Sequence, residues 1–490
     1  MSGIALANPA LFNERALIGG SWCAAASGAV IAVDNPATGQ VIGTVPDCGA
    51  GETAQAIAAA EAALPGWRDT LARDRAALLQ RWHDLVLANL ADLAQIMCAE
   101  QGKPLAEAQG EIRYAASFIA WFAEEAKRID GSIIPAPEPD RCILVMKEPV
   151  GVSAAITPWN FPAAMITRKC APALAAGCPV IIKPSDLTPF TALALVVLAE
   201  QAGFPAGVIN IVTGMPQAIG STITASPVVR KLSFTGSTRV GALLMRQCAD
   251  TIKRLSLELG GNAPLIVFED ADLDLAVAAT MVSKFRNAGQ TCVCANRILV
   301  HDAVHDAFAD KLARAVTQLK LGAGDQPGVT IGPLINRAAS DKVMAHIDDA
   351  LGHGARIHAR AEGPDGDGRF VAPVVLTGAS TAMRLAHEET FGPVAPIFRF
   401  HDEQEAIDLA NATSYGLASY FYTENLHRAF RVGRKLEAGM VALNTGSMAM
   451  EVAPFGGIKQ SGLGREGAHA GIDEYLETKT FHIGGLKLQP

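Results

Sequence analysis

The feature that most constrains the fold is a regular alternation of apolar strands and helices that begins at Pro149. Repeated strand–helix–strand units predict a parallel sheet covered by helices. The expected strands are 151–157, 179–183, 208–212 and 231–235, and the expected helices are 165–176, 188–202, 218–225 and 242–249.

Polar side chains follow these strands. Asn160 comes after the first strand, Lys183 closes the second, and Gly236 and Ser237 lie between the last strand and its helix. Ligands bind at the carboxyl ends of parallel strands, and a helix N-terminus after a Gly/Ser turn offers N–H groups to phosphate. The turn at 236–241 matches neither common phosphate-loop spacing, so an ordinary strand–helix turn is the alternative. Lys183 favours phosphate binding because a buried cation needs a polar partner.

A second alternation starts near Leu257 and predicts a second sheet, which suits a chain of 490 residues that is too long for one core. Its expected strands are 264–267, 297–300, 370–376, 394–399 and 441–443, and its expected helices are 273–287, 303–320, 342–353 and 403–412. Ahead of both sheets, 54–64, 73–97 and 107–128 have helical spacing of apolar residues. Residues 129–141, with three prolines, predict an extended excursion, and the segment from Tyr475 predicts a strand that pairs outside its domain.

Composition argues against several classes of protein. The net charge is −8 and no Lys/Arg block stands out, so we expect no nucleic-acid partner. The N-terminus lacks a signal-peptide pattern, and the most apolar run, 171–182, is too short to span a bilayer, so we expect no membrane partner. The nine cysteines follow neither a disulfide nor a zinc spacing. We therefore expect a cytoplasmic location and no metal site.

Cys292 is the candidate nucleophile. It lies in the polar, glycine-containing segment 285–297, and its small or uncharged neighbours at 289–291 leave the thiol uncrowded. Backbone N–H groups in such a turn can point at a developing anion. The alternative is a buried cysteine that packs as a small hydrophobe.

Two further residues suit chemistry beside a thiol. Glu258 lies in an apolar run broken by two glycines, which predicts a raised pKa and a general base. Its alternative is a helix-end glutamate that faces solvent. Asn160 lies between two aromatic residues and offers an amide donor for an oxyanion, and its alternative is a turn residue before Pro162.

A cysteine, a glutamate, an asparagine amide and a strand–helix turn suited to phosphate occur together in this sequence. With these residues the chain resembles the aldehyde dehydrogenase superfamily over nearly its whole length. Seven motifs stand in the family's order: Pro158-Trp159-Asn160-Phe161-Pro162, Lys183-Pro184, Phe234-Thr235-Gly236-Ser237-Thr238, Leu257-Glu258-Leu259-Gly260-Gly261, Gly289-Gln290-Thr291-Cys292, Glu389-Thr390-Phe391-Gly392-Pro393 and Pro454-Phe455-Gly456-Gly457. The resemblance implies an α/β fold with a Rossmann-type parallel-sheet cofactor domain, an α/β catalytic domain and a small oligomerisation arm. The implied bounds are 1–128 and 148–256 for the NAD(P)-binding domain, 257–440 for the catalytic domain and 129–147 with 475–490 for the arm, while 441–474 returns to the cofactor domain and walls the substrate pocket.

The resemblance also implies a mechanism. The Cys292 thiolate would attack an aldehyde, and the Asn160 side chain and the Cys292 N–H would hold the oxyanion of the thiohemiacetal. Hydride transfer to nicotinamide would leave a thioester, which water activated by Glu258 would hydrolyse. Lys169 and Glu477 match positions that the family links to Glu258 in a proton relay.

The implied cofactor is NAD, preferred over a possible NADP. The implied cofactor-binding residues are Trp159, Lys183, Asp186, Gly236, Ser237, Glu389 and Phe391. Lys183 would contact the adenine ribose, and Ser237 would contact the pyrophosphate. Glu389 and Phe391 would contact the nicotinamide half. The aspartate faces the ribose 2′ position in the family, where a carboxylate accepts hydroxyl hydrogen bonds and repels a 2′-phosphate.

Within the family, the succinate-semialdehyde dehydrogenase branch is most similar, on residues 165–169, 283–296 and 459–467. In that branch the residues matching Arg168 and Arg286 hold the distal carboxylate, which suits a dianionic product. The alternative is that either arginine pairs with a structural acidic residue. The implied substrate-binding residues are Arg168, Arg286, Phe161, Phe455 and Ser447.

One departure from the branch affects the expected substrate. Ala449 and Met450 stand where the branch usually has Ser and a second polar residue, so the carboxylate clamp is incomplete unless Ser447 substitutes. Met448 and Met450 make the pocket mouth more apolar. Succinate semialdehyde is the expected substrate, while glutarate semialdehyde or a less polar aliphatic or aromatic aldehyde stays open. A thiol esterase or acyltransferase without cofactor is the alternative from another class.

Two further expectations rest on the resemblance. Cys294 can form a reversible disulfide with the nucleophile in this branch, and so small a ring is strained and easily reduced. A packing cysteine is its alternative. The arm implies a homodimer or a homotetramer built as a dimer of dimers.

Overall fold

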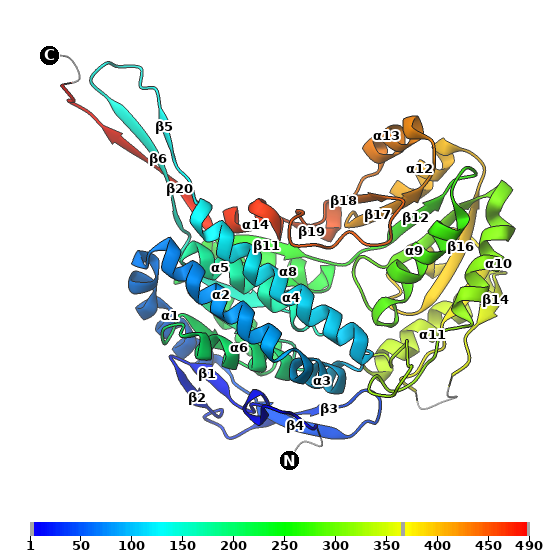
Figure 1. Ribbon diagram of the computed structural model, residues 1–490, viewed down its shortest axis with the longest axis horizontal. Helices are drawn as coiled ribbons and strands as arrows, with labels where there is room; N and C mark the ends of the chain where they lie inside the picture. The colour runs from blue at the N-terminus through cyan, green and yellow to red at the C-terminus, as the bar shows by residue number, and fades with distance from the viewer. Residues whose placement is uncertain (1–3, 364–367, 488–490) are drawn as a thin grey trace.

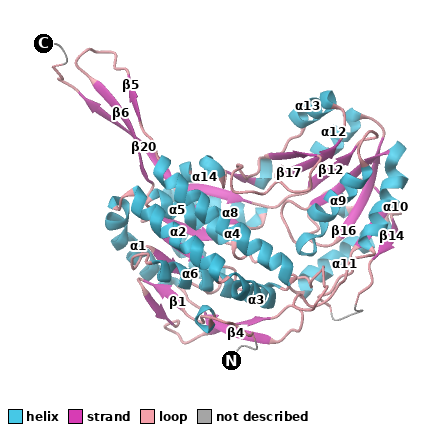
Figure 2. Cartoon of the chain, in the orientation of Figure 1, coloured by secondary structure: helices cyan, strands magenta, loops and turns pink. Residues whose placement is uncertain are grey.

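The computed structural model describes residues 4–363 and 368–487. The first residues of the expected cofactor domain, 1–3, and the last of the expected arm, 488–490, lie outside the described residues. Figure 1 shows two α/β bodies side by side and a narrow β arm that projects from one of them. Helices cover the large sheet of each body (Figure 2).

Eight strands form the first sheet, in the order β19-β11-β10-β7-β8-β9-β1-β2. Strands β7 to β11 run parallel, as the strand–helix alternation predicts, and β19, β1 and β2 are antiparallel to their neighbours. The bounds are β1 Ala16–Ile18, β2 Ser21–Cys23, β7 Val152–Ile156, β8 Val180–Lys183, β9 Ile209–Ile211, β10 Val229–Thr235, β11 Arg254–Glu258 and β19 Gly462–Leu463.

Helices pack on both faces of the first sheet, which is why β7 and β8 are largely apolar. One face contacts α2 to α6 in the largest apolar core, and the other face contacts α1, α7 and α8. A short helix, α14, packs beside α4 and α5. The bounds are α1 Ala50–Asp69, α2 Ala72–Ala88, α3 Leu90–Gln101, α4 Leu105–Glu125, α5 Ala164–Ala176, α6 Phe190–Ala202, α7 Pro216–Ala225, α8 Thr238–Cys248 and α14 Ala468–Asp473.

Seven strands form the second sheet, in the order β14-β15-β16-β13-β12-β17-β18. All neighbours are parallel except β14 and β15. The strands are β12 Ala263–Val267, β13 Ala295–His301, β14 Arg356–Arg360, β15 Val374–Ala379, β16 Val394–Phe400, β17 Ala418–Tyr422 and β18 Met440–Leu443. The helices are α9 Leu273–Phe285, α10 His305–Val316, α11 Arg337–Gly352, α12 Glu403–Asn411 and α13 Leu426–Lys435.

The arm is an antiparallel sheet of β5 (Ser132–Ile134), β6 (Cys142–Pro149) and β20 (Leu476–Ile483) in the order β20-β6-β5. Its register pairs Leu476 with Pro149, so the C-terminal strand joins the hairpin made by the proline-containing excursion. A separate hairpin of β3 (Val30–Asp34) and β4 (Val41–Pro46) lies near the N-terminus.

Two helices expected from the sequence are shorter than predicted. The segment 73–97 breaks at Asn89, which leaves the helical conformation and donates its side-chain amide to the Leu85 carbonyl. The helix expected over 273–287 ends at Phe285, because the residues that follow turn into the left-handed region. Within the described residues, no helix combines the length and the apolar character that crossing a membrane requires.

Several short elements were not expected from the sequence: strands β11, β14, β17 and β19 and helices α13 and α14. Strand β11 alternates polar and apolar residues over only five positions, and β17 is equally short. Because β11 belongs to the first sheet, the boundary expected after residue 256 falls after Glu258 instead. Because β18 belongs to the second sheet, that sheet extends to Leu443 rather than to 440.

Candidate active site

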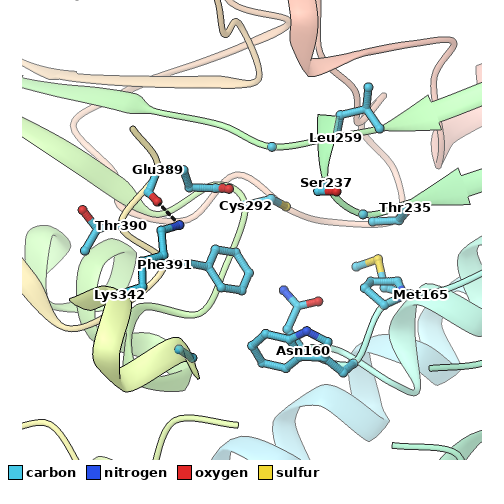
Figure 3. A pocket seen from close by; sticks show the side chains of 15 residues that line it. Asn160, Met165, Thr235, Ser237, Leu259, Cys292, Lys342, Glu389, Thr390 and Phe391 are labelled. Atoms are coloured by element: carbon cyan, nitrogen blue, oxygen red, sulfur yellow. Dashed lines mark hydrogen bonds between the residues drawn. The ribbon is translucent and has the colours of Figure 1, made fainter. Parts of the chain in front are cut away.

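A pocket of about 270 Å³ lies where the carboxyl ends of β7, β10 and β11 face the second body (Figure 3). The first body lines the pocket with the segments that follow these strands. The second body lines it with α11, with the segment before β16 and with residues 286–294, the loop between α9 and β13 that contains Cys292 and is named the cysteine loop. The lining residues are Pro158, Trp159, Asn160, Met165, Thr235, Gly236, Ser237, Leu259, Gly260, Cys292, Ala339, Lys342, Glu389, Thr390 and Phe391. Ala339 and Lys342 belong to none of the sequence motifs, because both lie in the ordinary helical pattern of α11.

Cys292 lies in the pocket because the chain turns sharply after α9. Asn287, Ala288 and Gly289 have φ values of 53°, 54° and 76°, a run of left-handed residues that delivers the next segment into the pocket. Burial, followed by the Glu389 carboxylate, raises the pKa of Cys292 to about 12. The resting thiol is therefore protonated at neutral pH and needs a base.

Glu258 ends β11 and is 3% exposed. Neither of its carboxylate oxygens has a hydrogen-bond partner among the described residues. Burial and the neighbouring Glu466 carboxylate raise the pKa of Glu258 well above its ordinary value. Its charge also contributes to the raised pKa of Cys292, so the two side chains are electrostatically linked. A carboxylate held without partners and with a high proton affinity suits a general base.

Asn160 points into the pocket beside Cys292 (Figure 3). Its side-chain Nδ2 donates to the Gln290 carbonyl at 3.0 Å, which leaves the second N–H of the amide for a ligand. The backbone carbonyl of Asn160 accepts from Lys103 Nζ at 2.9 Å and from Asn287 Nδ2 at 3.0 Å. The backbone of Asn160 and its side-chain amide are therefore both held by hydrogen bonds.

The residues behind Asn160 were missed in the sequence. Lys103 forms a fully buried ion pair with Glu111, whose Oε1 accepts from the Ala163 N–H at 2.9 Å at the start of α5. Gln101 Nε2 donates to Asn287 Oδ1 at 2.9 Å. This network joins α3 and α4 to the cysteine loop. A lysine and a glutamate in helical segments carry no sequence signal for such a contact.

Lys169 and Glu477 were expected to join Glu258 in a proton relay, and the structure does not bring these two residues together. Lys169 is fully buried and forms its ion pair with Glu466. Glu477 lies on β20 with a side chain 58% exposed, where it pairs with Arg254 at 3.4 Å. Burial raises the pKa of Glu466, but Lys169 and Arg168 outweigh burial and hold that pKa below its ordinary value. Glu466 falls inside the motif 459–467 that carried the branch resemblance, which is the signal that would have found it.

Most of the expected cofactor residues meet in the pocket. Trp159 and Phe391 pack edge to face, with ring centroids 5.6 Å apart. Ser237 caps α8 by accepting from the Val240 N–H at 3.4 Å. A Cβ on Gly236 would collide with the ring of Phe234, so the turn stays open only with glycine. A helix N-terminus, an open turn and aromatic walls fit a dinucleotide.

Glu389 faces the same pocket. Its Oε1 accepts from the Gly261 N–H at 3.1 Å, and burial raises its pKa to about 7. Lys342 Nζ donates to the Glu389 carbonyl at 2.5 Å (Figure 3). The pocket thus has a carboxyl and an ammonium group on the wall opposite Asn160.

Lys183 and Asp186 do not line this pocket. Lys183 ends β8, is 3% exposed and lies 3.6 Å from Asp186 Oδ1. Burial lowers the pKa of Lys183, and Asp186 offsets part of that shift. The carboxylate expected to face a ribose is therefore already an ion-pair partner of the lysine.

The two arginines expected to bind substrate differ in whether an acidic residue pairs with them. Arg168 is 1% exposed, lies 2.7 Å from Glu466 and stacks on Phe455 at 3.9 Å. Its charge is thus taken up by an acidic residue, which is the alternative that the sequence left open. Arg286 has no ion pair within the described residues and stacks on Phe161 at 5.1 Å.

Arg286 and Ser447 meet in a second, narrow pocket. That pocket is lined by Val282, Ser283, Arg286, Val293, Tyr420, Gly446, Ser447, Met448 and Ala449. Two serines therefore share a pocket with the unpaired guanidinium, although Ala449 replaces the serine usual in the branch.

Cys294 is buried, and its thiol contacts Lys284. Its Sγ accepts from Lys284 Nζ at 3.2 Å, and burial raises its pKa. All nine cysteines are free thiols. The disulfide with Cys292 stays a prediction.

Comparisons of the whole chain with known proteins identify its relatives. The family model described as "Aldehyde dehydrogenase family" matches residues 22–481. A glutarate-semialdehyde dehydrogenase and a 3-sulfolactaldehyde dehydrogenase, both of Pseudomonas putida, are 58% and 57% identical to this chain, over 96% and 98% of it and 98% and 99% of their own lengths. An Escherichia coli protein named succinate-semialdehyde dehydrogenase (NADP(+)) is 57% identical over 97% of this chain and 98% of its own.

A solved structure gives the same result for the fold. The crystal structure of succinate-semialdehyde dehydrogenase from Burkholderia pseudomallei is 59% identical, superposes with a TM-score of 0.97 and covers 98% of this chain and 100% of its own. Two largely parallel sheets, a thiol and an amide in one pocket and a buried carboxyl at the end of β11 are thus accompanied by similarity over almost the full length. The chain belongs to the aldehyde dehydrogenase family, whose members oxidise aldehydes with NAD(P).

Proposed function

We propose that this enzyme oxidises a small aldehyde with a distal anionic group, succinate semialdehyde in the first place, to the carboxylic acid. The observation that carries the substrate class is Arg286, a half-buried guanidinium without an ion pair among the described residues, which stacks on Phe161. A partly desolvated cation of this kind is best satisfied by a bidentate anion. The three relatives are named for succinate semialdehyde, glutarate semialdehyde and sulfolactaldehyde, each of which carries an anionic group.

The proposed reaction starts from the neutral thiol. Glu258 removes the proton of Cys292, and the thiolate attacks the aldehyde carbon to form a thiohemiacetal. The free N–H of the Asn160 amide and the Cys292 backbone N–H stabilise its oxyanion. Trp159, Glu389 and Phe391 would hold the nicotinamide, whose chemistry would be to act as the hydride acceptor for this carbon. After Glu258 has lost this first proton to solvent, it takes a proton from water, whose oxygen displaces the Cys292 thiolate from the thioester and releases the acid.

The same side chains would hold the dinucleotide. Ser237 and the N-terminus of α8 suit the pyrophosphate, and Trp159, Phe391 and Glu389 surround the space expected for the nicotinamide half. The preference for NAD is not supported by the name of the E. coli relative, which carries NADP(+). It rests on Asp186 alone, and the ion pair with Lys183 reduces the repulsion that a 2′-phosphate would meet. NAD preference therefore stays a prediction, with NADP as the competing cofactor.

Glutarate semialdehyde is the second candidate. Ala449 in place of a serine removes one polar contact, and Met448 and Ala449 pack against the apolar core of the second body. A longer substrate, with its aldehyde carbon at Cys292, would place its distal carboxylate at Arg286. That carboxylate would make fewer other polar contacts than in the branch. The P. putida relative named for glutarate semialdehyde supports this candidate.

The test is the initial rate of NADH or NADPH formation with succinate semialdehyde, glutarate semialdehyde, hexanal and benzaldehyde. The two semialdehydes should have kcat/KM values at least about tenfold above the uncharged aldehydes, as expected for a charge-assisted contact. Higher values for hexanal or benzaldehyde would show that Arg286 does not bind substrate. Ester cleavage without any reduced cofactor would instead identify the thiol esterase or acyltransferase.

We also propose roles for the larger parts of the chain. The first body would bind the dinucleotide, the second would supply the nucleophile, and the segment after β18 would wall the substrate pocket. The β arm would join subunits in a homodimer or a homotetramer. A cytoplasmic location belongs to the same proposal.

A further inference from the structure

Helix α11 packs against one wall of the pocket, the four residues from Glu388 to Phe391. These residues, 388–391, are named the wall segment, and three of them line the pocket beside Lys342 of α11 (Figure 3). Gly392, which follows the segment, approaches α11 so closely that a Cβ there would lie 2.3 Å from Val343 Cγ2. The conformation of the wall segment therefore depends on the helix beside it.

The wall segment ends in a strained backbone conformation. Phe391 has a φ of 56°, which residues other than glycine rarely adopt. Such a conformation costs free energy and persists only where the surrounding contacts impose it. Because the Phe391 ring packs edge to face on Trp159, this backbone also fixes the place of an aromatic wall of the pocket.

Hydrogen bonds from two elements hold the backbone of the wall segment. Asn296 on β13 donates from Nδ2 to the Glu388 carbonyl at 3.1 Å, and its Oδ1 accepts from the Thr390 N–H at 3.3 Å. Lys342 on α11 donates to the Glu389 carbonyl at 2.5 Å. The backbone is thus held at three successive residues before Phe391.

His346 holds the side chains of the same segment. It lies on α11 one turn after Lys342 and is 0% exposed. Its Nε2 lies 3.2 Å from Glu388 Oε2, and its Nδ1 lies 3.2 Å from Thr390 Oγ1. One imidazole ring therefore joins two side chains that flank Glu389.

The surroundings of His346 decide which ring nitrogen carries the proton. Burial lowers the pKa of His346, and the hydrogen bond with Glu388 offsets part of that shift, so the ring is neutral at neutral pH. The Arg384 hydrogen bonds hold the pKa of Glu388 below its ordinary value, so this carboxylate is ionised and can only accept. The neutral ring therefore donates from Nε2 to Glu388 and accepts at Nδ1 from the Thr390 hydroxyl.

We propose that His346 is a positioning residue for the nicotinamide half of the cofactor. The proposal rests on the proposed function, which places that half beside Glu389 and Phe391. His346 lies behind the residues that line the pocket, so it acts through Glu388 and Thr390. With both side chains fixed, the Glu389 carboxyl and the Phe391 ring stay where the nicotinamide half would bind.

The adenine half provides an internal comparison. Under the proposed function it is bound by Ser237 and the N-terminus of α8, which belong to the first body, whereas α11 and the wall segment belong to the second. Loss of the His346 contacts should therefore affect one half of the dinucleotide and spare the other. A histidine that only filled space in the core would affect neither half once a ring of similar size replaced it.

The experiment compares His346→Phe with the wild type, because phenylalanine keeps a ring and removes both hydrogen bonds. The control is His305→Phe, which replaces another buried histidine of the second body, 3% exposed and hydrogen-bonded to Asp306 at 2.8 Å. Calorimetric titrations without aldehyde give Kd for NADH and for ADP, which lacks the nicotinamide half. The same titrations are run with NADPH and 2′-phospho-ADP. The KM for the aldehyde is measured separately.

His346→Phe should raise Kd for the reduced dinucleotide about tenfold, as expected for the loss of two hydrogen bonds. It should leave Kd for the adenine diphosphate and the KM for the aldehyde unchanged, and His305→Phe should change none of these values. An unchanged Kd for the reduced dinucleotide, an equal rise for the adenine diphosphate, or an equal effect of His305→Phe would overturn the assignment.

A second variant covers the case in which His346→Phe does not fold. The Glu388 side chain is 47% exposed, so Glu388→Ala should fold, and it removes the acceptor of His346 Nε2. It should also weaken the reduced dinucleotide and spare the adenine diphosphate, and equal Kd values to the wild type would overturn the assignment. A wild type that binds no dinucleotide would contradict the proposed function, whereas a binding wild type with unaffected variants would contradict only the role of His346.

Discussion

At the scale of single residues, the site depends on how each charge is paired. Arg168, Lys169 and Glu466 satisfy one another, whereas Glu258 and Arg286 have no ion-pair partner among the described residues. The two unpaired groups are therefore the ones free to act on a proton and on an anion. Cys292, Glu258 and Asn160 could be found in the sequence because each lies in a motif of the family. Glu466 could not be told from Glu477 without the packing of α5 against the segment that follows β19.

The first prediction concerns Arg286. Arg286→Leu should raise KM for succinate semialdehyde about ten- to hundredfold, since a charge-assisted contact contributes about 1.5–3 kcal/mol. The rate with hexanal should stay unchanged, as measured by initial NADH formation. Arg168→Leu is the matched variant. It should slow the oxidation of both aldehydes to the same extent, because Glu466 keeps only Lys169 as an ion-pair partner. Equal losses for both aldehydes in Arg286→Leu would remove its assignment to substrate.

The second prediction concerns pH. The base must be deprotonated to act, and the pKa of Glu258 is raised, so kcat/KM should fall with decreasing pH at values above the ordinary 4.5 of a glutamate. Glu258→Gln should lower kcat about 10²–10⁴-fold and abolish this acidic limb. The measurement is the pH–rate profile of both proteins with one aldehyde. An acidic limb that survives in Glu258→Gln would point to another group.

At the scale of elements, the active site depends on where elements stop. The helical period of 273–287 does not show that α9 ends at Phe285, because apolar spacing continues while the backbone turns. Likewise, the helical period of 73–97 hides the break at Asn89. The parallel sheets could be predicted because strand–helix alternation is periodic. Side-chain contacts such as Asn287 with Asn160 depend on tertiary packing, which no local pattern encodes.

The third prediction tests the turn after α9. Asn287→Ala removes the side-chain contacts to Gln101 and to the Asn160 carbonyl and places alanine at φ 53°. It should destabilise the protein by about 1–3 kcal/mol and lower kcat more than it changes KM, because Asn160 loses its support. Asn287→Gly separates the two effects, since glycine tolerates positive φ. If the glycine variant has full kcat, the amide network does not position Asn160.

At the scale of the whole molecule, two distant segments build the arm. The sequence predicted an extended excursion near 129–141 and a C-terminal strand that pairs elsewhere, but its alternation could not identify β6 as the partner. The arm exposes apolar side chains, with Ile133 73% and Phe481 50% exposed. Exposed apolar residues on a projecting sheet are suited to contact between subunits.

The fourth prediction follows from these exposed residues. The double variant Ile133→Lys and Phe481→Lys should lower the mass measured by sedimentation, because charges would be buried at the subunit contact. Val30→Lys on β3, which is 59% exposed and outside the arm, is the control and should leave the mass unchanged. An unaltered mass in the double variant would place the subunit contact elsewhere.

The central claim is that Cys292 carries the acyl group and Glu258 releases it. Glu258→Gln, given a long incubation with succinate semialdehyde and NAD or NADP, should form reduced cofactor slowly, because its thiol has lost the base. Formation should stop at about one reduced cofactor per subunit, because the covalent intermediate cannot turn over. Peptide mass spectrometry should then find a succinyl group on the peptide that contains Cys292. Continuous turnover in this variant, or reduced cofactor without any acyl group on that peptide, would contradict the account.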